Sequence, residues 1–262
     1  MQIAFADKAP AVRRAAIAIL PTLPLSAAAK TQQLATLYAK GSTAEKQGVF
    51  EVLGGLKSAE SRQALQGYIE QLNAGTLPAD LQVDLLDAVQ TDGSETLVKG
   101  LETYRTAKRA DTLVQAFAEA LTKGGDYRAG MRVITDNPAA ECTRCHTIRG
   151  RGSDVGPELT HIGSTLTRAQ LVEALVTPNA RIAPGFGTVS VTLKSGEKID
   201  GTVRSESDTE VVLSAGTPPA DRTIAKTDIA SRTDPVSAMP PLGLILKPRE
   251  VRDVVEFLAN LR

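Results

Sequence analysis

The sequence is poor in the residues that most metal and thiol sites need. Its 262 residues include two cysteines, two histidines and no tryptophan. Two cysteines cannot form a four-thiolate zinc site, and the scarcity of histidine disfavours a mixed one. Both cysteines, Cys142 and Cys145, belong to one short motif, so no other cysteines remain to form a structural disulfide.

Net charge and long apolar runs are absent as well. Thirty basic residues balance thirty acidic ones, so the sequence lacks the excess positive charge that typically binds nucleic acid. Apolar stretches are interrupted well short of the roughly 18 to 20 residues that span a bilayer. The chain enters a helical pattern directly after Met1 without a signal peptide, so we expect it to be a piece of a longer protein.

The first half of the chain has helical periodicity from residue 10 to residue 123. Proline, glycine and serine interrupt the period at several points. We predict helices at residues 11–20, 34–39, 44–56, 61–72, 81–89, 94–104 and 111–121.

Two stretches of this half, starting at Lys46 and Leu81, look like copies about 35 residues apart, which is typical of a stacked α-solenoid. The segment DKAPAVRRAAIAIL resembles the HEAT-repeat family. Such repeats serve either as a protein-docking surface or as a spacer between domains.

The second half follows a polar, glycine-rich segment at residues 123–130. A capping box of Thr167 and Gln170 predicts a helix up to Pro178. From residue 188 to about 233 the period changes to two, which predicts four or five strands in a small SH3-like barrel or curled sheet. An amphipathic helix ends the chain.

The pattern Cys142-Thr143-Arg144-Cys145-His146 matches the C-x-x-C-H signature of covalent c-type haem attachment. Two thiols on one turn can each add to a haem vinyl group, and the imidazole that follows then lies beneath the iron. A reducing C-x-x-C pair or half of a zinc site could share this spacing.

Three further segments resemble small monohaem cytochromes c. These are the Gly-Pro-x-Leu segment at 156–159, the pair Met239-Pro240 and the terminal helix. More specifically, residues 124–262 resemble the c-type haem-binding domain of large Planctomycetes and Verrucomicrobia proteins, through CTRCHTIRGRGSDVGPELTHIG, LTRAQLVEALVTPNARIAPGF, VTLKSGEKIDGTVRSESDTEVVL and SAMPPL...REVRDVVEFLANL. This sequence lacks the aromatic residue often found before the motif, and Lys247 is a poor N-cap for the last helix.

The resemblance implies a fold and a ligand set. The fold is mainly α, with HEAT-like repeats at 1–123 and a cytochrome c-like domain at 124–262, interrupted by the β insert at about 187–233. Cys142 and Cys145 would carry the thioethers of one haem c, His146 would be the proximal iron ligand and Met239 the distal one. The carbonyl of Pro157 would orient His146.

The implied function is single-electron transfer, by a carrier more than a catalyst. Export to the periplasm or a similar compartment follows from c-type attachment, and the partner is a redox protein such as a dehydrogenase domain of the same longer polypeptide. Two alternatives stay open: an open distal site, giving a sensor or peroxidase-like protein, and a repeat-based docking subunit that relays electrons. His161 is either a second distal candidate or a loop residue at the haem rim, and Arg149 and Arg151 either pair with propionates or are solvated.

Overall fold

The computed structural model describes residues 2–216 and 220–262. The chain forms two compact units. Unit 1 takes in the chain up to Val133 together with Leu246–Phe257, and unit 2 takes in Ile134–Ile245 and Leu258–Arg262. These bounds reflect which residues pack together in space. The boundary predicted between residues 123 and 124 rests on amino-acid composition alone and stays a prediction.

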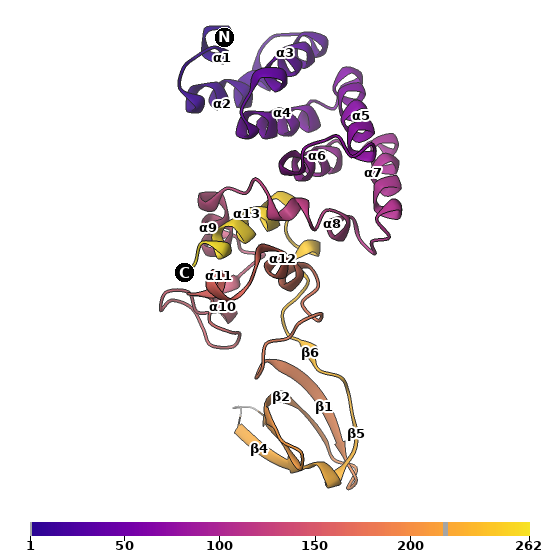
Figure 1. Cartoon of the computed structure of the whole chain (residues 1–262), viewed down its shortest axis with the longest axis vertical. Helices are drawn as coiled ribbons and strands as arrows, with labels where there is room; N and C mark the ends of the chain where they lie inside the picture. The colour runs from indigo at the N-terminus through magenta and orange to yellow at the C-terminus, as the bar shows by residue number, and fades with distance from the viewer. Residues whose placement is uncertain (1, 217–219) are drawn as a thin grey trace. The chain divides into compact units, whose positions relative to one another are not determined.

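Unit 1 is built from helices, as predicted for the first half of the chain (Figure 1). Its long helices are α2 (Pro10–Ile19), α3 (Ala27–Lys40), α4 (Thr43–Leu56), α5 (Ala59–Asn73), α6 (Ala79–Asp92) and α7 (Glu95–Ala107), together with most of α9 (Tyr127–Asp136) and most of α13 (Pro248–Ala259). Its short helical segments are α1 (Gln2–Phe5), η1 (Leu20–Thr22), α8 (Leu113–Ala116) and η2 (Ala120–Thr122).

Six of the predicted helices correspond to α2–α7, and capping explains where several of them begin. Helix α3 starts well before the predicted residue 34, because Ser26 Oγ accepts the Ala29 N–H at 3.2 Å. The single helix predicted at 111–121 is wrong, since the chain leaves helical dihedral angles at Phe117. That side chain is buried, with its ring centroid 5.0 Å from that of Tyr104, so packing overrides the helical period.

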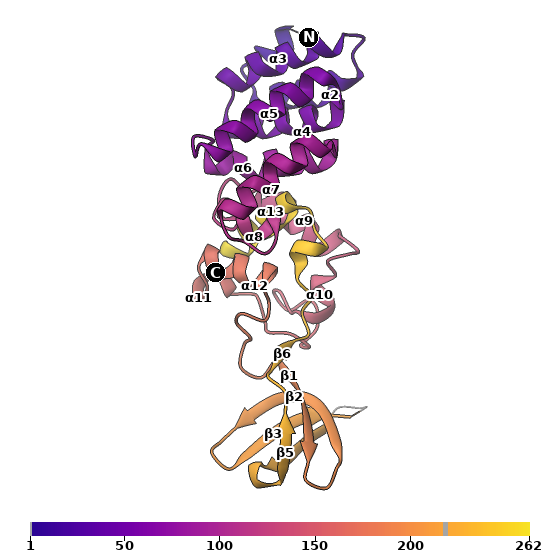
Figure 2. The same cartoon turned by 90° about the vertical axis from the view of Figure 1, so that its right-hand side faces the viewer.

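The long helices pack on the second helix along the chain, α2 on α4, α3 on α5, α4 on α6 and α5 on α7 (Figure 2). Helices α4 and α6 approach closely at Gly54 of α4. A Cβ atom built there would lie 2.5 Å from the Ala88 carbonyl oxygen of α6. At the neighbouring Gly55 a Cβ atom would meet nothing within 4 Å.

Helix α13 contributes buried charge to unit 1. Arg252 and Asp253 are 5% and 7% exposed. The Arg252 Nη1 group donates to Asp84 Oδ2 of α6 at 2.6 Å, and Asp253 Oδ1 accepts the Asp126 N–H at 2.9 Å. Both buried carboxylates therefore have donors, as buried charges require.

The first turn of α13 is capped by carboxylates. The Lys247 N–H donates to Glu250 Oε2 at 2.8 Å, so Glu250 supplies the cap that the Lys247 side chain lacks. Asp87 Oδ2 of α6 accepts the Arg249 N–H at 3.2 Å. Negative charge at this end also complements the helix dipole.

Asp87 makes the stability of unit 1 depend on pH. Burial raises the pKa of Asp87 to about 7, although Arg249 opposes the shift. Its folded-state pKa is therefore above the unfolded value of about 3.9, so Asp87 binds a proton on folding and the free energy of unfolding falls as pH rises between the two values. We expect a loss on the order of 2 kcal/mol between about pH 5 and pH 8.

Urea unfolding across this pH range measures the effect. Asp87→Asn should flatten the decline, whereas Asp111→Asn, a change at an exposed aspartate, should leave it as in the wild type. An equally steep decline in Asp87→Asn would show that other groups cause it.

Unit 2 contains a six-stranded antiparallel sheet, one strand more than the sequence predicts (Figure 1). The strand order is β4-β3-β2-β1-β5, and β6 pairs separately with β1. The strands are β1 (Gly187–Leu193), β2 (Lys198–Glu206), β3 (Glu210–Ala215), β4 (Ala220–Ala225), β5 (Ile229–Arg232) and β6 (Val236–Ser237), with the 3₁₀ turn η3 (Lys226–Asp228) before β5.

The additional strand β6 lies beyond the predicted end of the insert at residue 233. It pairs Val236 with Thr188 and Ser237 with Gly187. A strand of two residues has no periodicity of its own, so the pairing alone defines it. The predicted turns around Gly196 and Ser207 are confirmed, and Gly196 has φ +89°.

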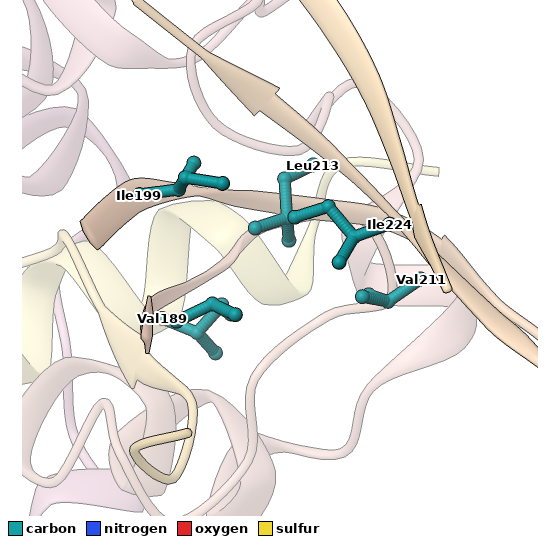
Figure 3. Packing of buried hydrophobic residues seen from close by; sticks show 6 residues of the cluster. Val189, Ile199, Val211, Leu213 and Ile224 are labelled. Atoms are coloured by element: carbon teal, nitrogen blue, oxygen red, sulfur yellow. The ribbon is translucent and has the colours of Figure 1, made fainter. Parts of the chain in front are cut away.

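The sheet has its own apolar core (Figure 3). The core residues are at most 6% exposed and alternate along the strands; they are Val189, Val191, Ile199, Val211, Leu213 and Ile224.

The helices of unit 2 are short. They are α10 (Cys142–Cys145), α11 (Ile162–Thr165), α12 (Arg168–Val176) and the 3₁₀ turn η4 (Leu242–Leu244). The predicted capping box of α12 is confirmed, with the Thr167 N–H donating to Gln170 Oε1 at 2.9 Å. Among the described residues of either unit, no helix is long and apolar enough to cross a membrane.

Candidate functional site

The C-x-x-C-H motif forms a single helical turn and its exit. Helix α10 runs from Cys142 to Cys145, and residues three apart lie on one helix face. His146 leaves the helix in extended conformation, and its N–H donates to the Cys142 carbonyl at 2.9 Å. Both thiols are free, with Cys142 half-buried and Cys145 exposed.

The cysteines do not have the environment of a reducing dithiol. Burial raises the pKa of the Cys142 thiol above its usual value. Redox-active C-x-x-C motifs instead lower a thiol pKa, commonly at the start of a helix after a strand. Here helix α9 precedes the motif and α10 has four residues, so this environment disfavours the thiol-redox interpretation.

The imidazole of His146 is held by one hydrogen bond. Its Nδ1 lies 2.7 Å from the carbonyl oxygen of Pro157. A carbonyl only accepts, so the proton is on Nδ1 and the lone pair of the neutral ring is on Nε2. Within residues 2–216 and 220–262, Nε2 has no hydrogen-bond partner.

Two glycines make room for this histidine. A Cβ atom at Gly156 would lie 2.7 Å from the His146 Cε1 atom and 2.9 Å from Nδ1. Gly152 has φ +115°, and a Cβ atom there would lie 2.1 Å from the His146 carbonyl oxygen. Glycine is needed at both positions; the sequence placed Gly156 in the Gly-Pro-x-Leu segment without assigning it this role, and did not single out Gly152.

Two segments of the loop run side by side and are joined by hydrogen bonds. The Gly156 N–H donates to the Cys145 carbonyl at 2.6 Å, and the Leu159 N–H donates to the Thr147 carbonyl at 2.9 Å. These two bonds flank the His146–Pro157 contact, so the backbone on both sides of it is tied down.

The other predicted site residues also belong to unit 2. Met239 is half-buried in the loop between β6 and η4, and its N–H donates to Ser237 Oγ at 3.1 Å. His161, Arg149 and Arg151 are exposed, with His161 immediately before α11. The described contacts thus bring together Cys142, Cys145, His146 and Pro157, and the ligation by Met239 stays a prediction.

The donor set fits a covalently attached haem. Two free thiols share one turn, and the adjacent imidazole has Nδ1 engaged and Nε2 available. In the described part of the chain, no three His, Cys, Asp or Glu side chains gather in a way that could hold a metal ion. A ligand set that comes partly from a cofactor, as in haem, does not need such a cluster.

Comparison with known proteins adds no assignment, since no protein-family model and no curated protein matches this sequence. The residues of the site and their geometry carry the functional proposal.

Proposed function

We propose that this chain carries one haem c and transfers single electrons. Cys142 and Cys145 would each form one thioether, and His146 would bind the iron through Nε2. The observation that carries this proposal is the Nδ1–Pro157 contact of 2.7 Å, which leaves Nε2 available on the residue after two free thiols.

The protein groups around His146 have defined roles in this function. The Pro157 carbonyl holds the proton on Nδ1, which selects the tautomer that can bind a metal and raises the basicity of Nε2. Gly156 leaves space for the ring in that orientation. The bound haem would supply the one-electron couple, and a Met239 thioether as second ligand would favour a raised reduction potential and a closed iron site.

We infer further that residues 1–123 form a HEAT-like solenoid and that residues 124–262 form a cytochrome c-like domain with an SH3-like insert. Packing of α2, α3, α4 and α5, each on the second helix along the chain, supports the solenoid. Attachment of haem c implies an exported protein, and the electron donor or acceptor would be a redox protein, such as a dehydrogenase domain.

Expression with a c-type haem maturation system, as an exported protein, tests the attachment. The wild type should retain haem on a denaturing gel, and Cys142→Ala/Cys145→Ala should retain none. Cys142→Ala or Cys145→Ala alone should keep one thioether at reduced yield. A wild type without covalent haem, or a double variant that keeps it, would refute the attachment.

Spectra of the loaded protein test the distal ligand. Met239→Ala should change the oxidised and reduced spectra, whereas Met131→Ala, a control on α9, and His161→Ala should not. If Met239→Ala leaves the spectra unchanged, Met239 is not the ligand. Binding of carbon monoxide by the wild type without delay would favour the alternative of an open sensor or peroxidase-like site.

A further inference from the structure

The side chain of Thr160 links the segment that carries Pro157 to the segment that follows His146. Its Oγ1 atom accepts the N–H of Arg149 at 2.7 Å and donates to Glu158 Oε1 at 2.8 Å. Together with the two backbone bonds described above, this makes a third link between residues 145–149 and 156–160. The links lie on both sides of the His146–Pro157 contact.

Arg149 is the residue that needs such a link. It has φ +51° and Gly150 has φ +76°, and Ile148 and Arg151 pair across them. Two central residues with positive φ are typical of a type I′ turn, which favours asparagine, aspartate and glycine. Arginine in the left-handed region is strained, and such strain persists only where surrounding contacts hold it.

We propose that Thr160 is a positioning residue for His146. Two backbone hydrogen bonds between Ile148 and Arg151, of 2.8 and 3.1 Å, close the 148–151 turn. By holding the Arg149 N–H, the Thr160 hydroxyl ties this turn to the 156–160 segment and keeps that segment in register. That register places the Pro157 carbonyl opposite Nδ1. The geometry itself does not depend on haem, whereas its consequence for an iron ligand rests on the proposed function.

The haem-free full chain allows a test that does not involve the cofactor. Nitrogen-15 spectra of the imidazoles at a pH above their titration report which ring nitrogen carries the proton. The wild type should show His146 mainly protonated on Nδ1. Thr160→Val, which keeps the shape and loses the hydroxyl, should reduce this preference by about fivefold, the ratio that a typical hydrogen bond contributes.

Controls separate positioning from general damage. Thr160→Ser retains the hydroxyl and should restore the wild-type ratio. Glu158→Gln keeps an acceptor for the hydroxyl and should also leave the ratio unchanged. His161→Asn assigns the spectrum, because the chain has two histidines. A wild-type ratio in folded Thr160→Val would overturn the proposal.

A measurement on the wild type covers the case in which Thr160→Val does not fold. The Arg149 amide is in an exposed turn, and its bond to Thr160 should slow its hydrogen exchange by about tenfold or more relative to an unprotected amide. Exchange at the unprotected rate would contradict the link. In the haem-loaded protein, Thr160→Val should shift the midpoint potential and Thr160→Ser should not. If the haem-free protein shows the expected tautomer ratios but no haem attaches covalently, the proposed function is rejected and the role of Thr160 stands.

Discussion

Replacement of Arg252 by alanine should lower the free energy of unfolding by about 3–5 kcal/mol, the usual cost of leaving one member of a buried ion pair without its partner. Arg252 is 5% exposed, and its Nη1 atom lies 2.6 Å from Asp84 Oδ2. Without the guanidinium, the buried Asp84 carboxylate must either lose its charge or draw water into the contact between α6 and α13. Urea unfolding followed by circular dichroism measures the loss.

Two further variants of the chain test whether the loss comes from the buried ion pair. Lys99→Ala removes an exposed pair with Glu95, at 2.7 Å on α7, and should cost less than about 1 kcal/mol. Asp84→Leu/Arg252→Met replaces the two charges of this pair by apolar groups, while Asp253 keeps the Asp126 N–H as a donor, and should recover most of the stability. An Arg252→Ala loss no larger than that of Lys99→Ala would show that the pair is hydrated.

Substitution of two adjacent glycines by alanine should change stability in opposite directions. Gly54→Ala would put a methyl group 2.5 Å from the Ala88 carbonyl oxygen, so α4 and α6 must separate, at a cost of about 1–3 kcal/mol. Gly55→Ala meets no atom within 4 Å, and alanine should stabilise the exposed helix position by about 0.5–1 kcal/mol.

The same unfolding measurement applies to both variants, and each is the control for the other. They share the helix, the residue type and the chemical change, so a difference in sign isolates the crossing of α4 and α6. Equal effects would mean that helix propensity, not packing, governs both positions.

Local signals explain why much of the fold could be predicted. Periodicity and caps act within a few residues, and they indicated helices α2–α7, the start of α12 and the turns of the sheet. The Arg252–Asp84 pair joins positions 168 residues apart, and a single sequence has no signal for such complementarity. For the same reason, the sequence did not indicate that buried charges anchor the last helix.

The candidate site divides in the same way. The attachment motif is contiguous, and the resemblance to cytochromes c suggested the Pro157 carbonyl beside His146; the structure has this contact at 2.7 Å. Gly156 and Thr160 were not predicted to support the histidine. The role of Gly156 depends on a close approach to the His146 ring, and that of Thr160 on a left-handed arginine at 149, a conformation that the residue type does not suggest.

The pairing of β1 with β6 has a consequence for the way the chain is assembled. Gly187 lies opposite Ser237, and Cα atoms opposite each other in an antiparallel ladder are about 4.5–5.5 Å apart. The backbone therefore enters and leaves the sheet at almost the same point, and a two-residue turn could join the two ends. We therefore expect that the sheet could be removed or replaced as a whole while the chain before Gly187 and after Ser237 keeps its path.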